Sequence, residues 1–391
     1  DLFRVWEEEC VIREVKSWTK VSEQNIDDDS FQKIVYEKNG LKIRKCFLMH
    51  INNAYVKSGD IEPKELFVVD DISEEIKIVE EDIEKRANKI LKIINSKEKP
   101  EISIGDYCDK PYGCSLKGNC WEFLPEENVF ELYRGGKKSF NFFDDGIHKI
   151  SEIPVSAKLT DIQKIQRSCA IDGKCNVDSN ELGNFLEKLE YPIYYLDFET
   201  FNPAIPLFDG MKPYQRIPFQ FSLHIQKDKD SKPEHFSFLA EGVSDPRPKF
   251  LQALKDNLGN KGTILVYSES FEKGVMRECC EAFPEFQEWL EGVLVRVEDL
   301  LYPFRNFHYY HPKQKGSASI KAVLPVMSDL SYDDLEISNG SLASIQYERV
   351  TFGDVDEKER ARVRKELEKY CEQDTWAEVL ILDKLREVVE N

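Results

Sequence analysis

Two carboxylates at the end of an apolar run have the residue types and the spacing of a divalent-cation site. The segment is Leu196-Asp197-Phe198-Glu199-Thr200. Positions i and i+2 of a strand share a face, so Asp197 and Glu199 are expected to point the same way. Neighbouring carboxylates repel each other unless a cation lies between them, and their hard oxygen atoms suit Mg²⁺ or Mn²⁺. The alternative interpretation is a solvated strand end.

Two later segments add acids beside predicted elements. Tyr370 and Asp374 are four residues apart in a predicted helix, so they share one helical face. Glu272 falls in the first turn of a helix that follows a strand. The structural alternatives are an amphipathic helix with Tyr370 in the core and an ordinary first-turn acid at Glu272.

The elements that must position these residues follow an α/β pattern from residue 181 onward. Apolar and alternating runs predict strands at 193–198, 219–225, 235–239 and 263–267. Helical periodicity predicts helices at 182–189 and 247–258, one starting near Phe271, and a long one at 356–389. We therefore expect a mixed sheet flanked by helices.

Residues 302–321 form a basic, aromatic strip without Asp or Glu in a chain that is acidic as a whole. Aromatic faces stack on unpaired bases and cations follow the phosphate backbone, so the strip predicts binding of single-stranded nucleic acid. The alternative is that the aromatic rings belong to the core and the lysines are solvated. The candidate nucleic-acid-binding residues are Arg305, Tyr309, Tyr310, Lys313, Lys315 and Lys321.

The N-terminal part has two further candidate sites. Residues 1–68 are predicted as strands and turns, and Glu14 and Lys16 share a face of one strand, where a carboxylate can hold a metal while Lys16 steadies a phosphate or water. A surface salt bridge is the alternative. Cys108, Cys114 and Cys120 follow C-x5-C-x5-C, which leaves a tetrahedral zinc or a four-iron cluster one ligand short. Cys10 or Cys46 could supply the fourth ligand, and three free thiols are the alternative.

The three acidic segments, in this order, resemble the DnaQ-like family of 3′–5′ exonucleases on an RNase H-like fold. The resemblance implies that Asp197, Glu199, Glu272 and Asp374 bind two Mg²⁺ or Mn²⁺ ions and that Tyr370 orients the attacking water. It also implies that nucleotides are released from the 3′ end of single-stranded DNA or RNA. The family usually has Asp where this chain has Glu272, and Glu269 competes with Glu272 for this ligand position.

The N-terminal residues resemble RecB-like nucleases of the PD-(D/E)xK class, on the order Asp1, Glu14-x-Lys16 and Gln32-x-x-x-Tyr36. This resemblance implies a partial restriction-endonuclease-like α/β domain in which Asp1 and Glu14 bind metal. It also implies that the three spaced cysteines belong to an iron–sulfur staple whose [4Fe-4S] cluster is incomplete here. The whole chain resembles a bacterial family, domain of unknown function 2779, in which a RecB-like nuclease with a cysteine staple precedes a DnaQ-like exonuclease.

The length and composition limit the class of protein to which the chain can belong. The chain has 391 residues with 54 Lys and Arg against 73 Asp and Glu, a formal net charge of −19, and its 41% hydrophobic content argues against disorder. Without an apolar run of about 18 residues or a signal peptide, we expect a cytoplasmic protein and no membrane partner.

Because residue 1 is Asp, we expect an incomplete first domain. The predicted boundaries are 1–125 for the RecB-like part, 126–188 for a connecting segment and 189–391 for the exonuclease domain.

Two hypotheses from different classes follow. The first is a metal-dependent 3′–5′ exonuclease joined to a truncated second nuclease domain. The second is a non-catalytic nucleic-acid-binding protein with a structural metal or iron–sulfur site. Convergence of the side chains of Asp197, Glu199, Glu272 and Asp374 favours the first, and their failure to converge favours the second.

Overall fold

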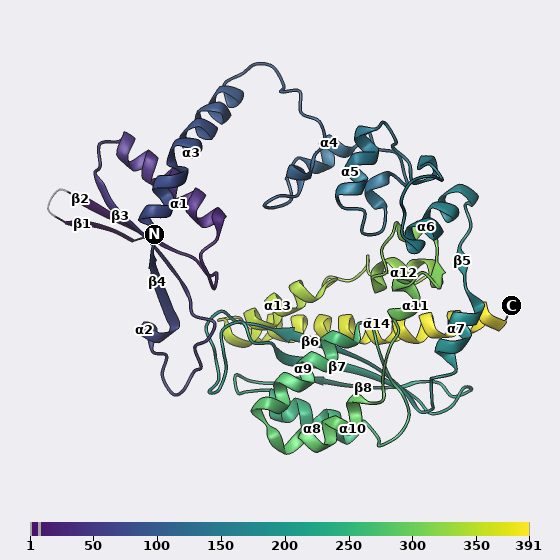
Figure 1. The fold of residues 1–391 in the computed structure, drawn as a ribbon. Coiled ribbons are helices and arrows are strands. Elements are labelled where there is room, and N and C mark those ends of the chain that lie inside the picture. Colours follow the sequence, from purple (N-terminus) through teal and green to yellow (C-terminus); the bar gives the residue numbers. More distant parts are fainter. Residues whose placement is uncertain (1, 7–8, 391) are drawn as a thin grey trace. The chain divides into compact units, whose positions relative to one another are not determined.

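The computed structural model describes residues 2–6 and 9–390 and divides the chain into two compact units (Figure 1). Unit 1 comprises Asp1–Cys120 and Asn202–Gln215, and unit 2 comprises Trp121–Phe201 and Arg216–Asn391. The predicted connecting segment, 126–188, falls within unit 2. Each unit is described by itself below.

Unit 1 is a four-stranded sheet with two helices packed against each other and against strand β3. The strand order is β1-β2-β3-β4, with β2 and β3 parallel and the outer pairs antiparallel. Its core contains the apolar side chains of Ile12, Cys46, Leu48 and Ile76. The elements are β1 (Leu2–Trp6), β2 (Glu9–Val15), α1 (Glu23–Lys38), β3 (Ile43–Ile51), α2 (Pro63–Leu66), β4 (Phe67–Asp71) and α3 (Ser73–Ile94), followed by α4 (Lys117–Trp121) at the boundary with unit 2.

Helix α1 corrects the expectation that residues 1–68 contain only strands and turns. Its N-terminus has a capping box, in which the side chains of Ser22 and Asn25 satisfy each other's backbone N–H groups. Its inward face buries the polar residues Asn25, Asp29 and Ser30 besides Ile26 and Ile34. A helix that buries polar residues lacks the clear apolar stripe on which the sequence pattern depends.

Unit 2 is an α/β unit around a five-stranded mixed sheet, as expected. No helix within residues 2–6 and 9–390 has both the length and the apolar character needed to cross a membrane. The elements are α5 (Lys137–Asp144), α6 (Asp161–Asp172), β5 (Asn176–Val177), α7 (Ser179–Leu186), β6 (Ile193–Phe201), β7 (Ile217–Gln226), β8 (Glu234–Leu239), α8 (Arg247–Asn257), β9 (Ile264–Val266), α9 (Glu269–Ala282), α10 (Gln287–Leu294), β10 (Val297–Asp299), α11 (Tyr302–Arg305), β11 (Tyr309–Tyr310), α12 (Ile320–Met327), α13 (Gly340–Phe352) and α14 (Glu357–Glu390).

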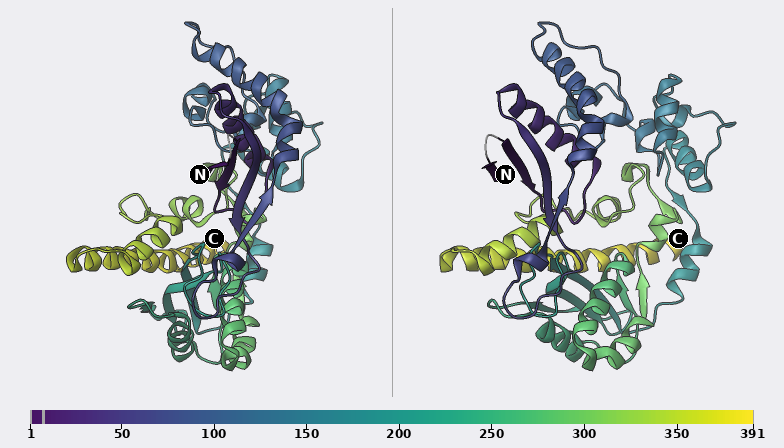
Figure 2. Two further views of the ribbon diagram at one scale, coloured as in Figure 1. Left: turned by 90° about the vertical axis from the view of Figure 1, so that its left-hand side faces the viewer. Right: turned by 60° about the vertical axis from the view of Figure 1, so that its left-hand side comes forward.

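The large sheet has the strand order β10-β9-β6-β7-β8. Strand β7 is antiparallel to both of its neighbours, β6 and β8, whereas β9 and β10 run parallel to β6. The predicted strands at 193–198, 219–225 and 235–239 and the long C-terminal helix are confirmed. Figures 1 and 2 show α14 running along the sheet of unit 2.

The two faces of this sheet differ in chemistry because side chains alternate along each strand. On β6 the residues Leu196 and Phe198 belong to the apolar core that contains Phe250 of α8 and Val275 of α9. On β7 the side chains that point away from this apolar core contact α14. Among them, Gln220 Nε2 donates a hydrogen bond to the backbone carbonyl of Leu367 at 2.9 Å. Asp197 and Glu199 alternate with Leu196 and Phe198 along β6, so their side chains lie on the face of the sheet that α14 covers.

Helices α5 and α6 lie within the predicted connecting segment, 126–188, where no helix was expected before residue 182. Helix α6 starts at a capping box between Thr160 and Gln163 and ends at Gly173, which has a left-handed backbone conformation. Its buried residues include Gln163 and Gln166, whose side chains bond to backbone groups of residues 131–133. Because α6 buries these two polar side chains, its sequence lacks the clear apolar periodicity from which a helix is predicted.

Substituting Gly262→Ala is expected to destabilise unit 2 by about 2–4 kcal/mol. The φ angle of Gly262 is +87°, and a Cβ there would lie 2.1 Å from the carbonyl oxygen of Pro192. Urea denaturation followed by circular dichroism measures the effect. The matched control is Gly183→Ala in α7, where a Cβ meets nothing within 4 Å and where we expect a gain of about 0.5–1 kcal/mol. Equal stability of the two variants would contradict this interpretation of Gly262.

Candidate metal-dependent active site

Three carboxylates from strand β6 and helix α14 converge beneath the helix. Asp197, Glu199 and Asp374 each offer an oxygen atom, and these atoms all lie within 4.8 Å of one another. Glu199 and Asp374 are buried, and Asp197 is half-buried. The predicted convergence of these three side chains is therefore present in the structure.

Burial and mutual repulsion raise the pKa of each of these carboxyl groups. For Asp197 the pKa is well above its ordinary value because the group is desolvated and faces Asp374, Glu199 and Glu272. For Glu199 and Asp374 burial is again the main cause, and the ammonium group of Lys321 acts in the opposite direction on both. A cation bound among these groups would offset the repulsion.

Glu272 is the buried acid of helix α9. It is 2% exposed, its Oε2 atom has no hydrogen-bond partner among the described residues, and burial raises its pKa to about 8. Glu269, the competitor, instead forms an i,i+4 ion pair with Lys273 and is half-buried. Glu272 lies outside the group of three but close enough to raise the pKa of Asp197. The structure thus places Glu272, and not Glu269, beside the carboxylates.

A strained turn directs the start of α9 toward the site. Ser268, the residue before α9, has φ +93°, a conformation that non-glycine residues rarely adopt. The buried carboxylate of Asp299 holds this turn, because its Oδ1 atom accepts hydrogen bonds from the backbone N–H groups of Ser268 (2.9 Å) and Leu301 (3.0 Å). The end of β10 therefore fixes the position of the first turn of α9.

Two tyrosines support Asp374. The Tyr332 hydroxyl donates a hydrogen bond to Asp374 Oδ1 at 2.5 Å, and both Tyr332 and Tyr370 lower the pKa of this carboxyl group against the effect of burial. The two rings meet edge to face, with 6.4 Å between their centroids. Tyr370 was predicted from its i,i+4 spacing, whereas Tyr332 lies in a loop with no such signal.

Substituting Tyr332→Phe is expected to weaken Mn²⁺ binding by about tenfold at neutral pH. Without the hydroxyl donor the charged form of Asp374 loses stabilisation, its pKa rises, and protons compete better with the metal. Titration of Mn²⁺ followed by electron paramagnetic resonance measures the affinity. The control is Tyr302→Phe, whose side chain is 41% exposed. Equal affinity in both variants would rule out this role for Tyr332.

Lys321 and the start of helix α13 close the site. The Lys321 Nζ atom donates to the carbonyl of Ser338 and lies 5.3 Å from the ring centre of Tyr332. At Gly340 an added Cβ would lie 3.3 Å from Glu199 Oε2, so the backbone of α13 approaches this carboxylate closely. Lys321, predicted as a nucleic-acid-binding residue, is thus placed beside the carboxylates.

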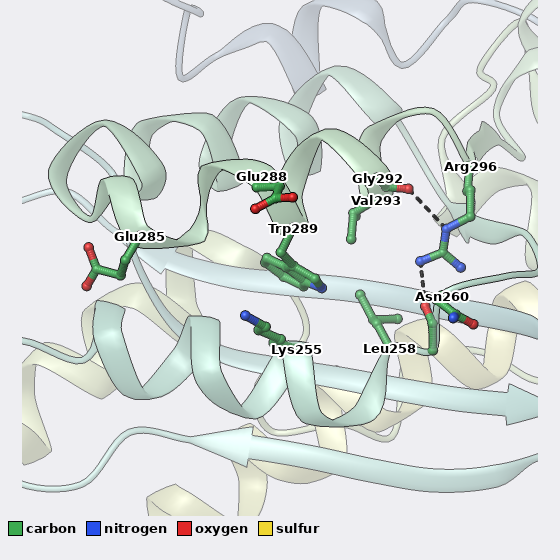
Figure 3. A pocket seen from close by; sticks show the side chains of 10 residues that line it. Lys255, Leu258, Asn260, Glu285, Glu288, Trp289, Gly292, Val293 and Arg296 are labelled. Carbon is green, nitrogen blue, oxygen red and sulfur yellow. Dashed lines mark hydrogen bonds between the residues drawn. The ribbon is translucent and has the colours of Figure 1, made fainter.

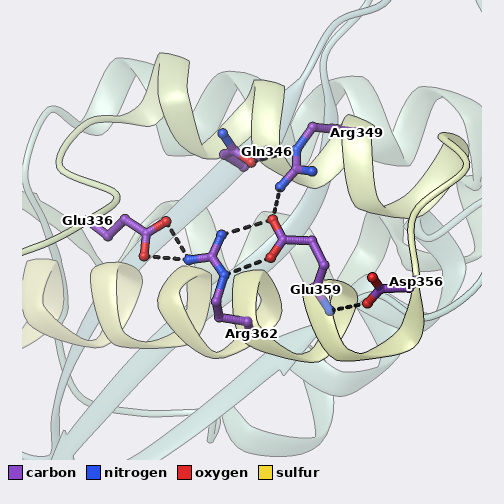
Figure 4. Close-up of polar contacts among 6 residues, drawn as sticks. All are labelled: Glu336, Gln346, Arg349, Asp356, Glu359 and Arg362. Carbon is purple, nitrogen blue, oxygen red and sulfur yellow. Dashed lines mark hydrogen bonds and ion pairs between the residues drawn. The ribbon is translucent and has the colours of Figure 1, made fainter.

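An ion-pair network fixes α13 and its preceding loop on α14 (Figure 4). Arg362 pairs with Glu359 at 2.7 Å and also with Glu336, from the loop before α13. Arg349 of α13 reaches the same Glu359 at 2.6 Å. Two residues of α14, Glu359 and Arg362, therefore bind the helix and the loop that position Gly340.

Sequence reasoning missed two residues of α14 next to the carboxylates. Glu378 continues the i,i+4 series of Tyr370 and Asp374, and its pKa is raised well above the ordinary value by burial and by Asp197. The Oε2 atom of Glu378 lacks a hydrogen-bond partner among the described residues. Cys371, also buried, places its sulfur 3.8 Å from Asp197 Oδ2. The repeated spacing of four residues could have identified Glu378.

The aromatic part of the strip at 302–321 is corrected by the structure. Tyr309 and Tyr310 are 6% and 2% exposed, and Tyr310 stacks on Phe307 with 4.1 Å between ring centres. Together with Cys169, Phe307 and Tyr310 form a small core. Both tyrosine rings are therefore taken up by packing and are not available for stacking on bases.

The cationic residues of the strip are exposed but dispersed. Arg305 Nη2 lies 3.8 Å from Asp299 Oδ2, and Lys315 Nζ lies 3.5 Å from Glu131 Oε1. Lys313 is exposed at the short turn that follows β11. Of the predicted cations, Lys321 is the one that lowers the pKa values of Glu199 and Asp374 in the part of the chain that the structure describes.

A second polar cluster lies in unit 1 around Glu14 and Lys16. Lys16 Nζ lies 2.8 Å from Glu14 Oε1 and 2.7 Å from Asp28 Oδ2. Gln32 Nε2 donates to Glu14 Oε2 at 3.3 Å. The structure thus brings together Glu14, Lys16 and Gln32, as the motif order predicted.

Asp29 is the residue of this cluster that sequence reasoning missed. It is fully buried without a hydrogen-bond partner for its carboxylate among the described residues, and burial together with Glu14 raises its pKa to about 7. Tyr36 packs against the core of unit 1. Asp1, predicted as a metal ligand, lies outside the described residues.

The spaced cysteines do not converge in the structure. Cys108 is buried, whereas Cys114 and Cys120 are exposed. Within residues 2–6 and 9–390, the groups of three or more metal-ligand atoms within 4.8 Å are the carboxylates above and His224, His235 and Glu372. Cys10 and Cys46, considered as a fourth ligand, are packed in the apolar core of the unit 1 sheet.

A pocket of about 480 Å³ lies between α8 and α10 and is separate from the carboxylates (Figure 3). Its lining includes Lys255, Trp289 and Arg296, and Arg296 donates to the carbonyl of Gly259 at 2.7 Å. Helix α8 covers the apolar face of the sheet, so this pocket lies on the face opposite to α14. It contributes no residue to the acidic site.

The comparisons with known proteins agree with the family expected from the sequence. The chain is 25% identical over 65% of its length to "Uncharacterized protein MG366 homolog" of Mycoplasma pneumoniae, covering 42% of that protein. It is 26% identical over 52% of its length to "Uncharacterized protein MG366" of Mycoplasma genitalium, covering 33%, and 25% identical over 50% to "Uncharacterized protein UU173" of Ureaplasma parvum, covering 31%. The chain therefore spans less than half the length of these relatives.

No solved structure is significantly similar to the chain. Residues 194–319, which include Asp197, Glu199 and Glu272 but end before α14, match the family model described as "Domain of unknown function (DUF2779)". The resemblance to this family that the sequence predicted is therefore confirmed over residues 194–319.

Proposed function

We propose that unit 2 is a metal-dependent nuclease, a DnaQ-like 3′–5′ exonuclease that shortens single-stranded DNA or RNA. The observation that carries the proposal is the convergence of Asp197, Glu199 and Asp374 within 4.8 Å beneath α14, next to the buried Glu272. A cluster of buried acids with so little positive charge around it is stabilised by divalent cations.

The residues present fit Mg²⁺ or Mn²⁺. All the candidate ligands are hard carboxylates, and the Oε2 atoms of Glu272 and Glu378 have no hydrogen-bond partner among the described residues. Two such ions, when bound, activate a water molecule and stabilise the leaving oxygen of a phosphodiester. Asp197, Glu199, Glu272 and Asp374 would hold the ions, and the hydroxyl of Tyr370 would orient the water.

The arrangement of the sheet supports an RNase H-like fold for unit 2. The carboxylates of Asp197 and Glu199 project from the central strand β6, which has the antiparallel strand β7 on one side and the parallel strand β9 on the other. Helix α14 supplies the third acid across the face of this strand. The strand bearing Asp-x-Glu and the helix bearing Tyr-x-x-x-Asp thus have the relative positions that the resemblance requires.

For unit 1 we propose a partial RecB-like nuclease domain with a restriction-endonuclease-like fold. The cluster of Glu14, Lys16 and Gln32 on β2 and α1 supports it. The same proposal includes an incomplete [4Fe-4S] cluster, for which the thiols of Cys108, Cys114 and Cys120 would have to move together, and a cytoplasmic location. Iron and sulfide analysis of the anaerobically purified protein tests the cluster, and absence of both would overturn that part.

Degradation of single strands labelled at the 5′ or the 3′ end tests the exonuclease proposal. We expect a ladder of shortened 5′-labelled products and immediate release of the 3′ label, with both requiring Mg²⁺ or Mn²⁺. Binding of the strands without any metal-dependent shortening would favour the second hypothesis, a non-catalytic nucleic-acid-binding protein. DNA and RNA strands of the same sequence are compared in parallel.

A further inference from the structure

Two histidines and a glutamate gather on the α14 face of the large sheet, apart from the acidic site. His224 of β7 and His235 of β8 are direct partners in the antiparallel register, so their side chains leave the sheet side by side. Glu372 of α14 reaches them from above, and one ligand atom from each of the three residues lies within 4.8 Å of the other two. His224 is 4% exposed.

A chain of hydroxyl groups contacts one nitrogen of each imidazole ring. Thr375 Oγ1 lies 3.2 Å from the carbonyl oxygen of Glu372, 2.7 Å from Ser222 Oγ and 2.8 Å from His224 Nδ1. Ser222 Oγ in turn lies 2.9 Å from His235 Nε2. These contacts leave Nε2 of His224 and Nδ1 of His235 as the ring nitrogens that can bind a metal ion.

The Nδ1 atom of His235 faces a carboxylate oxygen of Glu372. His235 Nδ1 and Glu372 Oε1 are 3.7 Å apart, too far for a hydrogen bond. Two ligands of a tetrahedral zinc ion, with bonds of 2.0–2.2 Å, lie about 3.4 Å apart. The spacing of these two atoms is thus close to that of neighbouring metal ligands. Metal-binding histidines usually have their other ring nitrogen held by a hydrogen bond, as both rings are here.

We propose that His224, His235 and Glu372 bind a zinc ion or a transition cation of similar chemistry. Imidazole nitrogen favours such cations over Mg²⁺, so this site differs in preference from the carboxylates of Asp197, Glu199 and Asp374. Two histidines and one glutamate leave a fourth position for water. The bound ion joins β7, β8 and α14 and stabilises the position of the helix that carries Asp374.

Zinc binding to the full-length chain tests the proposal, measured by competition with a chromogenic chelator in the presence of excess Mg²⁺. We expect wild type to bind one more zinc ion than the variants His235→Gln and Glu372→Gln, or to bind it at least about tenfold more tightly. The matched control is His148→Gln, which lies outside the cluster and should retain the wild-type affinity. Circular dichroism establishes that each variant is folded.

Two further results decide the location of the ion. Replacement of zinc by Co²⁺ should give a difference spectrum, wild type minus His235→Gln, without a thiolate charge-transfer band, because the ligands are nitrogen and oxygen. The variant Asp197→Asn should keep the zinc ion. Equal zinc binding by wild type, His235→Gln and Glu372→Gln would overturn the proposal, and so would loss of the ion in Asp197→Asn.

Discussion

The substitution Asp197→Asn is expected to lower the rate of metal-dependent strand shortening by about 10³-fold. Asp197 lies on the central strand, and its ligand atom is within 4.8 Å of those of Glu199 and Asp374. Asparagine keeps the shape of the side chain but removes the charge that holds a divalent cation. Metal ions contribute several kcal/mol to such reactions, and each 1.36 kcal/mol corresponds to a tenfold change in rate.

The control for this variant is Asp383→Asn on α14, whose carboxylate is half-exposed and pairs with Arg386. We expect its rate to remain that of wild type. In the absence of metal, Asp197→Asn should also be more stable than wild type, because it removes one of the repelling buried charges. A wild-type rate in Asp197→Asn would exclude Asp197 from catalysis, and an equal loss in Asp383→Asn would point to a general effect on folding.

The second large effect is a loss of stability of the metal-free protein as pH rises from about 5 to about 8. Burial raises the pKa of Glu272 from 4.5 to about 8, so in this range the folded state binds more protons than the unfolded state. The stabilisation is complete below the unfolded pKa and is lost as pH passes through the folded pKa. Since one pKa unit corresponds to about 1.4 kcal/mol, the loss is about 3–5 kcal/mol for Glu272.

Urea denaturation at several pH values, with and without Mg²⁺, measures this dependence. Mg²⁺ should restore stability at pH 8, because the cation replaces the protons that the carboxylates lose. The variant Glu272→Gln should have a flatter pH profile than wild type in the absence of metal. A metal-free profile that rises between pH 5 and 8 would contradict the assignment of Glu272 as a buried, uncompensated acid.

The parts of the fold that obey simple periodicities could be predicted from the sequence. Strand β6 is an apolar run that ends in Asp197 and Glu199, and α14 is long enough for its pattern to be clear. Helix α1 could not be predicted in this way, because its buried face includes Asn25, Asp29 and Ser30. Helix α6 likewise packs through the polar side chains of Gln163 and Gln166, which binary patterns do not reveal.

The residues of the candidate site also differ in whether local sequence patterns could predict them. Asp197, Glu199, Tyr370 and Asp374 are paired by spacing within one strand or one helix, which local geometry determines. Tyr332 reaches Asp374 across 42 positions of sequence, so its contact depends on how the loop before α13 folds. The tyrosines at 309 and 310 had the composition of a base-stacking surface, yet only their burial decides whether the rings are accessible.

Anomalous diffraction from crystals soaked in Mn²⁺ tests the central claim most directly, because it locates the cations without reference to activity. Two anomalous peaks about 4 Å apart are predicted among the carboxylates of Asp197, Glu199, Glu272 and Asp374, and both should disappear in Asp197→Asn crystals. Absence of any peak at these carboxylates at saturating Mn²⁺ would contradict the claim that this cluster is a metal-dependent active site.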